Sequence, residues 1–447
     1  MSDLPLELWL HITSFISDSE VWKLRAVNRI LLQVALDRRF RSVTLHLPFS
    51  KPTKSKQSEL RKLRRLTYVV QPDRAPIDSE TYSRGRNPIV ADRVREVVFS
   101  LGLCHVGRPG AKKWIWPPFK TVHQRISNLF DKKPQLAIRA FQTMENVTKM
   151  DVRCHTSFYL EYEQAVAGNL RYVVSAMSAF SSQLRSLSLT CNQFRYLAAA
   201  LSSSVLLPHL ENLAMTCLNT DTEMHGVSLI SQTENTVVSF VNRHHLTIRS
   251  LQFTTQKETQ HLAIITRIEH LQHLDCLHIV VHDPEALSIK NFIETHSQTL
   301  CKLTLWENPL HLRSPFLASR HDLFGRLKTP LARLKCLKVA LTPSSPFHLA
   351  TPLVEYVKTY SPTLTCLDIE YETLLHSDWQ AFLRADWSSL RDLRLQLCFA
   401  TLDVFDNISR VFSYLTSLSL RVTRVLAEHT DPDSDYEASL FVHPPIA

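Results

Sequence analysis

A short apolar pattern recurs along most of this chain, in which three apolar residues stand at positions i, i+3 and i+5. Two weaker copies, Val94-Val97-Phe99 and Val147-Met150-Val152, precede nine clear ones, and successive clear copies start 26, 38, 26, 26, 34, 30, 26 and 25 residues apart. The clear copies are Leu184-Leu187-Leu189, Leu210-Leu213-Met215, Ile248-Leu251-Phe253, Leu274-Leu277-Ile279, Leu300-Leu303-Leu305, Leu334-Leu337-Val339, Leu364-Leu367-Ile369, Leu390-Leu393-Leu395 and Leu415-Leu418-Leu420. A unit this short cannot bury its apolar face alone, so the copies must stack.

The spacing is typical of leucine-rich repeats, whose period is about 20–29 residues and whose units pair a short strand with a returning helix. Asn or Cys follows eight positions after the first apolar residue at Asn192, Asn308 and Cys398, as the repeat requires. Amphipathic stretches at 352–360 and 379–383 suit returning helices. We therefore expect an α/β fold over residues 91–425: a curved, leucine-rich-repeat-like solenoid with a parallel sheet on its concave face.

The residues between the apolar positions of each strand are expected to point to the concave face, since strand side chains alternate. In the early repeats they are small and neutral, whereas the later repeats carry charged and aromatic residues. An exposed Trp among charges is typical of a binding hot spot, although Trp306 could equally fold over a neighbouring turn. The candidate target-binding residues are His278, Lys302, Trp306, Lys338, Asp368, Glu370 and Arg394.

The first 36 residues predict three short helices. An apolar stripe at helical spacing follows Pro5 and consists of Leu4, Leu8, Ile12, Phe15 and Ile16. Ser17 and Glu20 have capping-box spacing, so a second helix should begin there, and a third should span residues 28–38. Helices this short need a partner or the rest of the chain to bury their apolar residues.

Two stretches in this region resemble an F-box: Leu4-Pro5-x-Glu7-Leu8-x-x-x-Ile12-x-x-Phe15-Ile16, and Leu24-Arg25-Ala26-Val27-Asn28-Arg29. An F-box followed by irregular leucine-rich repeats is similar to fungal F-box proteins. The chain departs from the usual motif in two places. The acidic position between the first helices is shifted within residues 16–21, and residues 30–32 lack the common Trp.

The resemblance implies a substrate receptor of an SCF-type ubiquitin ligase. The F-box would dock on a Skp-family adaptor, which links it to a cullin-RING ligase, and the repeats would hold an unidentified target protein. The residues implied in adaptor binding are Leu4, Pro5, Leu8, Ile12, Phe15, Ile16, Leu24 and Val27. The alternative is a leucine-rich-repeat scaffold outside ubiquitination, whose degenerate F-box caps the solenoid.

The expected domains are an F-box at 1–45, a basic linker with some helix at 46–90, the solenoid at 91–425 and an acidic, disordered tail at 426–447. Residues 51–65 hold seven basic residues and one Glu, without interleaved aromatics. This composition favours a solvated face over nucleic-acid binding, which is the last-ranked alternative. The loop Trp114–Phe119 is expected to pin the linker region onto the first repeats.

Other classes of function lack their motifs. The chain has seven glycines, and none form a phosphate-binding loop. Its nine cysteines form no CxxC pair, which favours reduced thiols in the cytoplasm or nucleus. Cys276, Cys336 and Cys366 share one repeat position, and their spacing predicts strands that are non-adjacent or only roughly adjacent; no local ligand pair accompanies them, so no zinc site is expected. We expect no enzyme activity, no catalytic residue, no metal or cofactor, and no membrane span.

Overall fold

The computed structural model divides into two compact units, Met1–His244 and His245–Ala447. The residues that it describes are 5–27, 29–48, 92–102, 141–142, 144–155, 163–191, 194–202, 204–217, 227–255, 264–280, 287–306, 324, 327, 329–340, 350–374, 376–400 and 403–425. The expected linker beyond residue 48, the loop Trp114–Phe119 and the expected acidic tail all lie outside these ranges.

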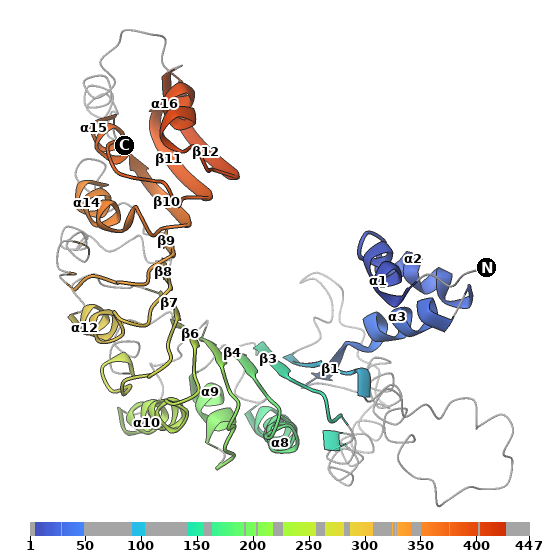
Figure 1. Ribbon diagram of the computed structural model, residues 1–447. Coiled ribbons are helices and arrows are strands. Elements are labelled where there is room, and N and C mark those ends of the chain that lie inside the picture. Colours follow the sequence, from blue (N-terminus) through green and yellow to red (C-terminus); the bar gives the residue numbers. More distant parts are fainter. Residues whose placement is uncertain are drawn as a thin grey trace, which may run out of the picture. The chain divides into compact units, whose positions relative to one another are not determined.

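The sheet of the first unit is parallel, and its strands pair in chain order. The paired strands are β1 (Ser42–Pro48), β2 (Glu96–Gly102), β3 (Lys149–His155), β4 (Ser186–Cys191) and β5 (Asn212–Cys217). The helices that return between strands are α8 (Glu163–Ala179), α9 (Phe194–Leu201) and α10 (Val227–Arg243). They lie on one face of the sheet (Figure 1).

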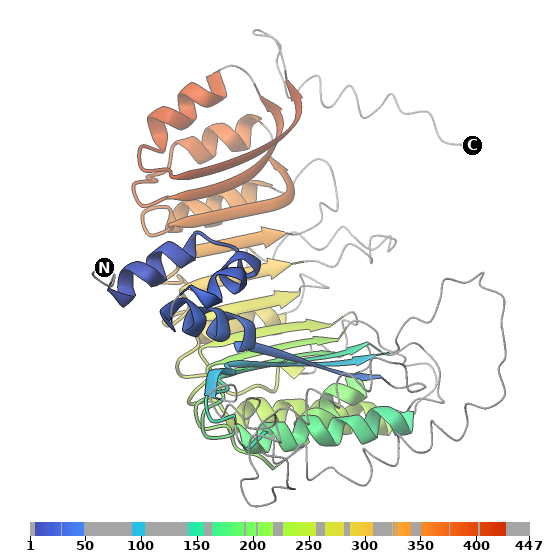
Figure 2. The same ribbon diagram turned by 90° about the vertical axis from the view of Figure 1, so that its right-hand side faces the viewer.

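The second unit repeats this arrangement. Its strands are β6 (Ser250–Thr255), β7 (Cys276–Val280), β8 (Lys302–Trp306), β9 (Cys336–Ala340), β10 (Cys366–Leu374), β11 (Asp392–Ala400) and β12 (Ser417–Val425), again parallel and paired in chain order. Figure 2 shows these strands side by side and pointing the same way. The returning helices are α12 (Leu287–Thr295), α14 (Ala350–Tyr360), α15 (His376–Leu383) and α16 (Asp403–Val411).

The recurring apolar pattern explains the strands of both units. In β4, for example, Leu187 and Leu189 are fully buried, whereas the residues before and between them are half-exposed. The first apolar residue of every copy from Val94 to Leu390 is likewise buried just before its strand begins. The last copy differs, because Leu415 is half-buried and Leu418 on β12 is 40% exposed. The expected parallel α/β architecture of leucine-rich-repeat type is therefore confirmed within each unit.

Buried side chains at the ends of the returning helices link neighbouring repeats. The Nε2 atom of His244, after α10, accepts a 3.1 Å hydrogen bond from the backbone N–H of Leu207. The hydroxyl oxygen of Tyr360, at the end of α14, accepts one of 3.1 Å from Leu331. Each bond satisfies a buried N–H in a loop that has no strand partner.

An N-terminal helical module, residues 5–27 and 29–40, precedes the first strand. It contains α1 (Leu6–Ser14), α2 (Asp18–Lys23), the 3₁₀ turn η1 (Leu24–Ala26) and α3 (Arg29–Phe40), close to the helices expected from the sequence. Its small core consists of Val21, Val34 and Ala35, with Ile16 and Ile30 packed against them. The expected capping interaction is confirmed, since the Glu20 carboxylate accepts hydrogen bonds from the backbone N–H and the hydroxyl of Ser17.

The helical module continues directly into the sheet. Strand β1 begins two residues after α3 ends and runs across the boundary expected between residues 45 and 46. The guanidinium of Arg93, just before β2, donates hydrogen bonds to the backbone oxygen and side chain of Gln33 and pairs with Asp37. Both partners lie on α3, so the module is fixed to the first strands by covalent continuity and by this bridge.

Candidate protein-binding surfaces

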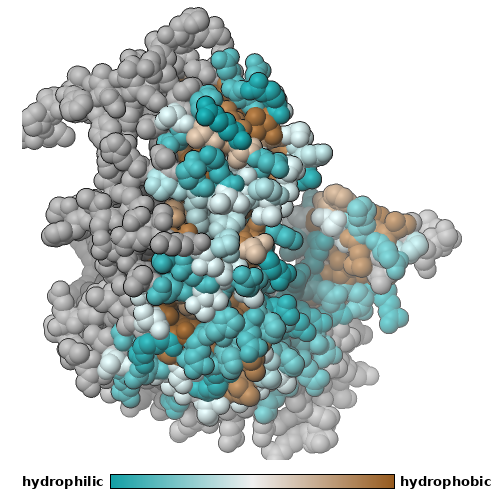
Figure 3. All heavy atoms as spheres, turned by 60° about the vertical axis from the view of Figure 1, so that its left-hand side comes forward, coloured by the Kyte–Doolittle hydropathy of each residue, from teal (hydrophilic) through white to brown (hydrophobic). Residues whose placement is uncertain are grey.

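An apolar face is exposed on the helical module. Leu8 is 46% exposed, Ile12 40%, Phe15 78% and Val27 65%. The first three follow one another at helical spacing along α1, and Val27 lies in the turn before α3. Figure 3 shows hydrophobic side chains gathered on this module, at the right of the view. We call these four residues the apolar face.

The other residues that the sequence assigns to this face differ in position. Pro5 is exposed and immediately precedes α1, while Leu24 is half-buried. Ile16 packs against the module's own core, so it supports the fold as well as lying beside the face. Leu4 lies outside the described residues.

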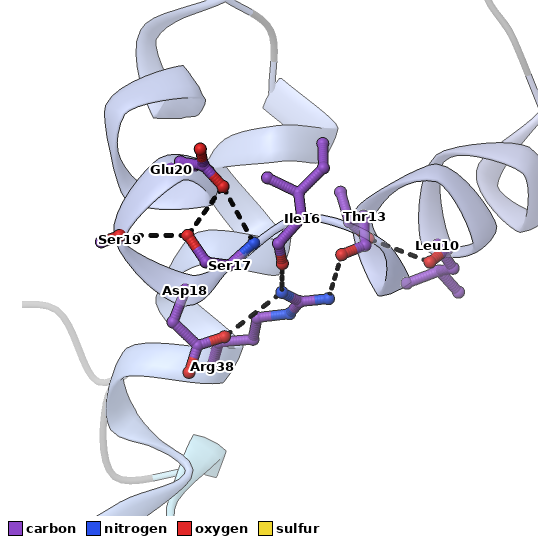
Figure 4. A network of polar contacts seen from close by, with 8 residues as sticks. All are labelled: Leu10, Thr13, Ile16, Ser17, Asp18, Ser19, Glu20 and Arg38. Carbon is purple, nitrogen blue, oxygen red and sulfur yellow. Dashed lines mark hydrogen bonds and ion pairs between the residues drawn. The ribbon is translucent and has the colours of Figure 1, made fainter.

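A half-buried arginine, Arg38, holds α1 in place (Figure 4). Arg38 on α3 donates one hydrogen bond of 2.6 Å to the backbone oxygen of Thr13 and one of 2.9 Å to that of Ile16. Thr13 lies in the last turn of α1 and Ile16 two residues beyond the helix, where backbone carbonyl groups lack the full set of helical hydrogen bonds. Arg38 also forms a 3.2 Å ion pair with Asp18. The network therefore orients α1 independently of any partner on the apolar face.

A second surface is the face of the second-unit sheet that lies opposite the helices. Strand register aligns one residue from each of six neighbouring strands in a row: Gln252, His278, Thr304, Lys338, Asp368 and Arg394. Four of these are candidate target-binding residues, so the structure brings together side chains that are 116 residues apart in the chain, from 278 to 394.

Charge in this row centres on Asp368. Its Oδ2 atom lies 3.2 Å from Nζ of Lys338 and 3.9 Å from Nη1 of Arg394, so one carboxylate faces two cations. The carboxylate is buried, and its Oδ1 atom has no hydrogen-bond partner within the described residues. Burial lowers the pKa of His278 in the same row, and the charge of Lys338 lowers it further. His278 is therefore neutral at pH 7.

The remaining candidates lie in the two flanking rows. Lys302 is exposed and occupies the row that also holds Cys336. Trp306 is half-buried at the end of β8, and register places it between Val280 and Ala340. Glu370 is half-buried and pairs with Ala340 in the same row. Asp368 was expected to be exposed on the concave face, but it is buried, as are Val280 and Ala340.

Sequence reasoning missed charged pairs on the first-unit sheet. The buried Asp151 accepts a 2.8 Å hydrogen bond from Nε of Arg153 and lies 2.7 Å from its Nη2 atom. At the start of the same strand, Lys149 forms a 2.8 Å ion pair with Glu96 on the neighbouring β2. The pattern Val147-Met150-Val152 already located this strand, and its alternation would have pointed to Asp151 and Arg153.

Three thiols share one row of the second-unit sheet. Cys336 and Cys366 occupy directly paired positions on β9 and β10, so their strands are adjacent, an arrangement that the sequence spacing left open. Their 30-residue separation spans one complete repeat. Cys276 is separated from Cys336 by Lys302 on β8. Among the described residues, no group of three or more His, Cys, Asp or Glu is placed to hold a metal ion.

Within the described ranges, no helix combines the length and hydropathy needed to cross a membrane. No family model and no curated protein matches the sequence. Among solved structures, the chain is similar to the leucine-rich repeat-containing protein LegL7 from Legionella pneumophila, with 11% sequence identity and a TM-score of 0.37. That match covers 90% of this chain and 99% of LegL7.

Proposed function

We propose that this chain is the substrate-recognition subunit of an SCF-type ubiquitin ligase. The helical module would dock on a Skp-family adaptor, and the open sheet face would bind a target protein. The observation that carries the proposal is the apolar face, because Leu8, Ile12, Phe15 and Val27 are exposed although the module has its own core. Apolar side chains gathered in this way are typical of an interaction site.

The chain would perform no bond chemistry in this role. The adaptor would connect the helical module to a cullin and a RING subunit, and the row around Asp368 would hold the target. Holding both in one assembly raises the effective concentration of the target's lysines near the activated ubiquitin. The row offers cations at Lys338 and Arg394 and a neutral imidazole at His278, which suits a polar protein surface.

Co-expression with a Skp-family adaptor, followed by size-exclusion chromatography, tests the proposal. The expected result is a one-to-one complex that is lost with Ile12→Asp or Phe15→Asp, since a charge on the apolar face opposes its burial. The matched control is Leu10→Asp. Leu10 is 50% exposed on the same helix but points to a different side, two residues from Leu8 and three from Thr13.

Each result decides a different point. If the complex survives both substitutions on the apolar face, adaptor docking does not use that face. If Leu10→Asp also abolishes the complex, the docking surface surrounds α1 and the assignment to one side is wrong. Circular dichroism of each variant must match that of the wild type, so that a loss of binding is not a loss of fold.

A second candidate function is a binding scaffold whose helical module caps the first strands. The direct passage from α3 to β1 and the bridge from Arg93 to Gln33 favour it. Hydrogen exchange separates the two functions. A cap protects the amides of α1 fully in the isolated protein, whereas a docking module gains protection there when the adaptor is added.

A further inference from the structure

Two thiols lie side by side on the open face of the second-unit sheet. Cys336 begins β9, Cys366 begins β10, and register pairs them directly across the parallel strands. Neighbouring strands are about 4.8 Å apart, which is within the range of Cα separations that a disulfide spans. Both thiols are free and half-buried, so small solutes have access to them.

The surroundings of the two thiols shift their pKa values in opposite directions. The Cys366 sulfur accepts a hydrogen bond from the Cys336 thiol, which together with the charge of Lys338 lowers the pKa of Cys366 to about 7. Burial, Asp392 and Asp368 act against this shift in pKa. The same hydrogen bond raises the pKa of Cys336, so one proton stays between the two sulfurs while Cys366 carries the negative charge.

We propose that Cys336 and Cys366 form a reactive thiol pair, which hydrogen peroxide oxidises to a disulfide across β9 and β10. The Cys366 thiolate attacks one peroxide oxygen and the O–O bond breaks. Hydroxide leaves and takes up a proton to become water, and Cys366 becomes a sulfenic acid. The Cys336 sulfur then attacks the Cys366 sulfur, the S–O bond breaks, and the hydroxyl leaves with the Cys336 proton as a second water. The two thiols lose two electrons and the peroxide gains them.

Other cysteines of the chain provide an internal comparison. Cys154, Cys191 and Cys217 are also neighbours in register, on β3, β4 and β5. All three are fully buried, and the hydrogen bond that the Cys191 thiol donates to Cys154, together with burial, raises the pKa of Cys191. Peroxide and electrophiles should therefore not react with them in the folded protein.

Cys276 separates the effect of exposure from the effect of pairing. It begins β7 in the same row and is half-buried like Cys336 and Cys366, but its neighbours in register are Ser250 and Lys302. Small solutes can therefore reach Cys276 as they reach the paired cysteines, but its neighbours in register are not thiols.

The disulfide would form on the face that carries the candidate target-binding residues, because Lys338 and Asp368 lie two residues beyond the paired cysteines. The inference does not depend on the proposed ligase role.

Peptide mapping of the intact protein after peroxide treatment tests disulfide formation. Trypsin cleaves after Lys335, Lys338, Lys358 and Arg384, so the disulfide would join peptide 336–338 to peptide 359–384. We expect this linked peptide to form, to disappear on reduction, and to be absent in Cys366→Ser. Recovery of both cysteines as free thiols, or of Cys366 as sulfinic acid without the linked peptide, would overturn the proposal.

The pH dependence of alkylation by iodoacetamide tests the pairing itself. We expect the rate at Cys366 to reach half its maximum near pH 7, below the value of about 8.5 for a thiol in a model peptide. Cys336→Ala removes the donor and should raise the Cys366 midpoint by about one pH unit or more. Cys336→Ser keeps a hydroxyl donor and should raise it less. A wild-type Cys366 midpoint near about 8.5, or no response of that midpoint to Cys336→Ala, would contradict a coupled pair.

Discussion

His296 accepts a 2.9 Å hydrogen bond at Nε2 from the backbone N–H of Leu271, which lies 25 residues earlier in the chain. The Nδ1 atom of the same ring lies 2.7 Å from the backbone oxygen of Phe292, so the neutral ring donates there and accepts at Nε2. His244 repeats both contacts with Leu207 and Phe240. A single neutral side chain thus joins the end of a returning helix to the loop of the preceding repeat.

Replacing His296 with Phe keeps the ring but removes both nitrogens. The N–H of Leu271 then stays buried without an acceptor, which costs about 1–3 kcal/mol. We expect the urea midpoint of the second unit to fall accordingly. His273→Phe is the matched control, because the side chain of His273 is exposed, two residues after Leu271 in the same loop. Equal losses of stability in the two variants would contradict a structural role for the His296 hydrogen bonds.

Stability should also fall in mild acid. Burial lowers the pKa of His296 to about 4; the contact with Phe292 opposes this shift, and the stacked ring of His270, 5.0 Å away, adds to it. The unfolded chain has the ordinary pKa of about 6.5, so between these values it binds more protons than the folded chain. The stabilisation is complete above about pH 6.5 and is lost as the pH falls towards 4.

Urea unfolding at pH 7, 6 and 5 measures this dependence. Burial also lowers the pKa of His244, so both units should lose stability in the same direction. The variant His296→Phe should show a shallower dependence than the wild type in the second unit. An unchanged slope in that variant would assign the acid sensitivity to other groups.

The sequence predicted the repeats well because each strand depends on a local spacing of apolar residues. The first strand was nevertheless missed, although Phe40, Val43 and Leu45 have the same i, i+3, i+5 spacing. Register pairs Val43 with Val97 and Leu45 with Phe99, as the pattern requires. Because the preceding helices resemble an F-box, the end of that domain was expected at residue 45, which is inside β1.

Contacts across strands were harder to predict than the strands themselves. The pairing of Lys338 with Asp368 joins residues 30 positions apart, and it depends on how many strands the chain forms between them. Because the copies of the apolar pattern are irregularly spaced, the sequence does not give the number of strands between two residues. For the same reason the sequence left open whether the strands of Cys336 and Cys366 are adjacent, and the register of β9 and β10 makes the two cysteines neighbours.

The Arg38 network predicts a large effect from one substitution in the helical module. Arg38→Met removes the charged donor from the backbone oxygens of Thr13 and Ile16, at about 2–3 kcal/mol. We expect the amides of α1 to exchange faster by a corresponding factor, about 30-fold or more. Asp18→Asn is the control, because Asp18 is exposed and its ion pair contributes about 1 kcal/mol or less. Similar exchange rates in the two variants would show that the carbonyl contacts contribute little.

The buried carboxylate of Asp368 makes Lys338 a structural residue as well as a candidate binding residue. Lys338→Ala leaves Asp368 with Arg394, 3.9 Å away, as its remaining cation among the described residues. A buried charge that loses its partner is destabilising, and we expect a loss of about 1–3 kcal/mol. Asp368→Asn removes the charge, so adding Lys338→Ala to it should cost little. A double-mutant cycle by urea unfolding measures the coupling. Additive losses would mean that the two side chains do not stabilise each other, and that Lys338 is free to contact a target.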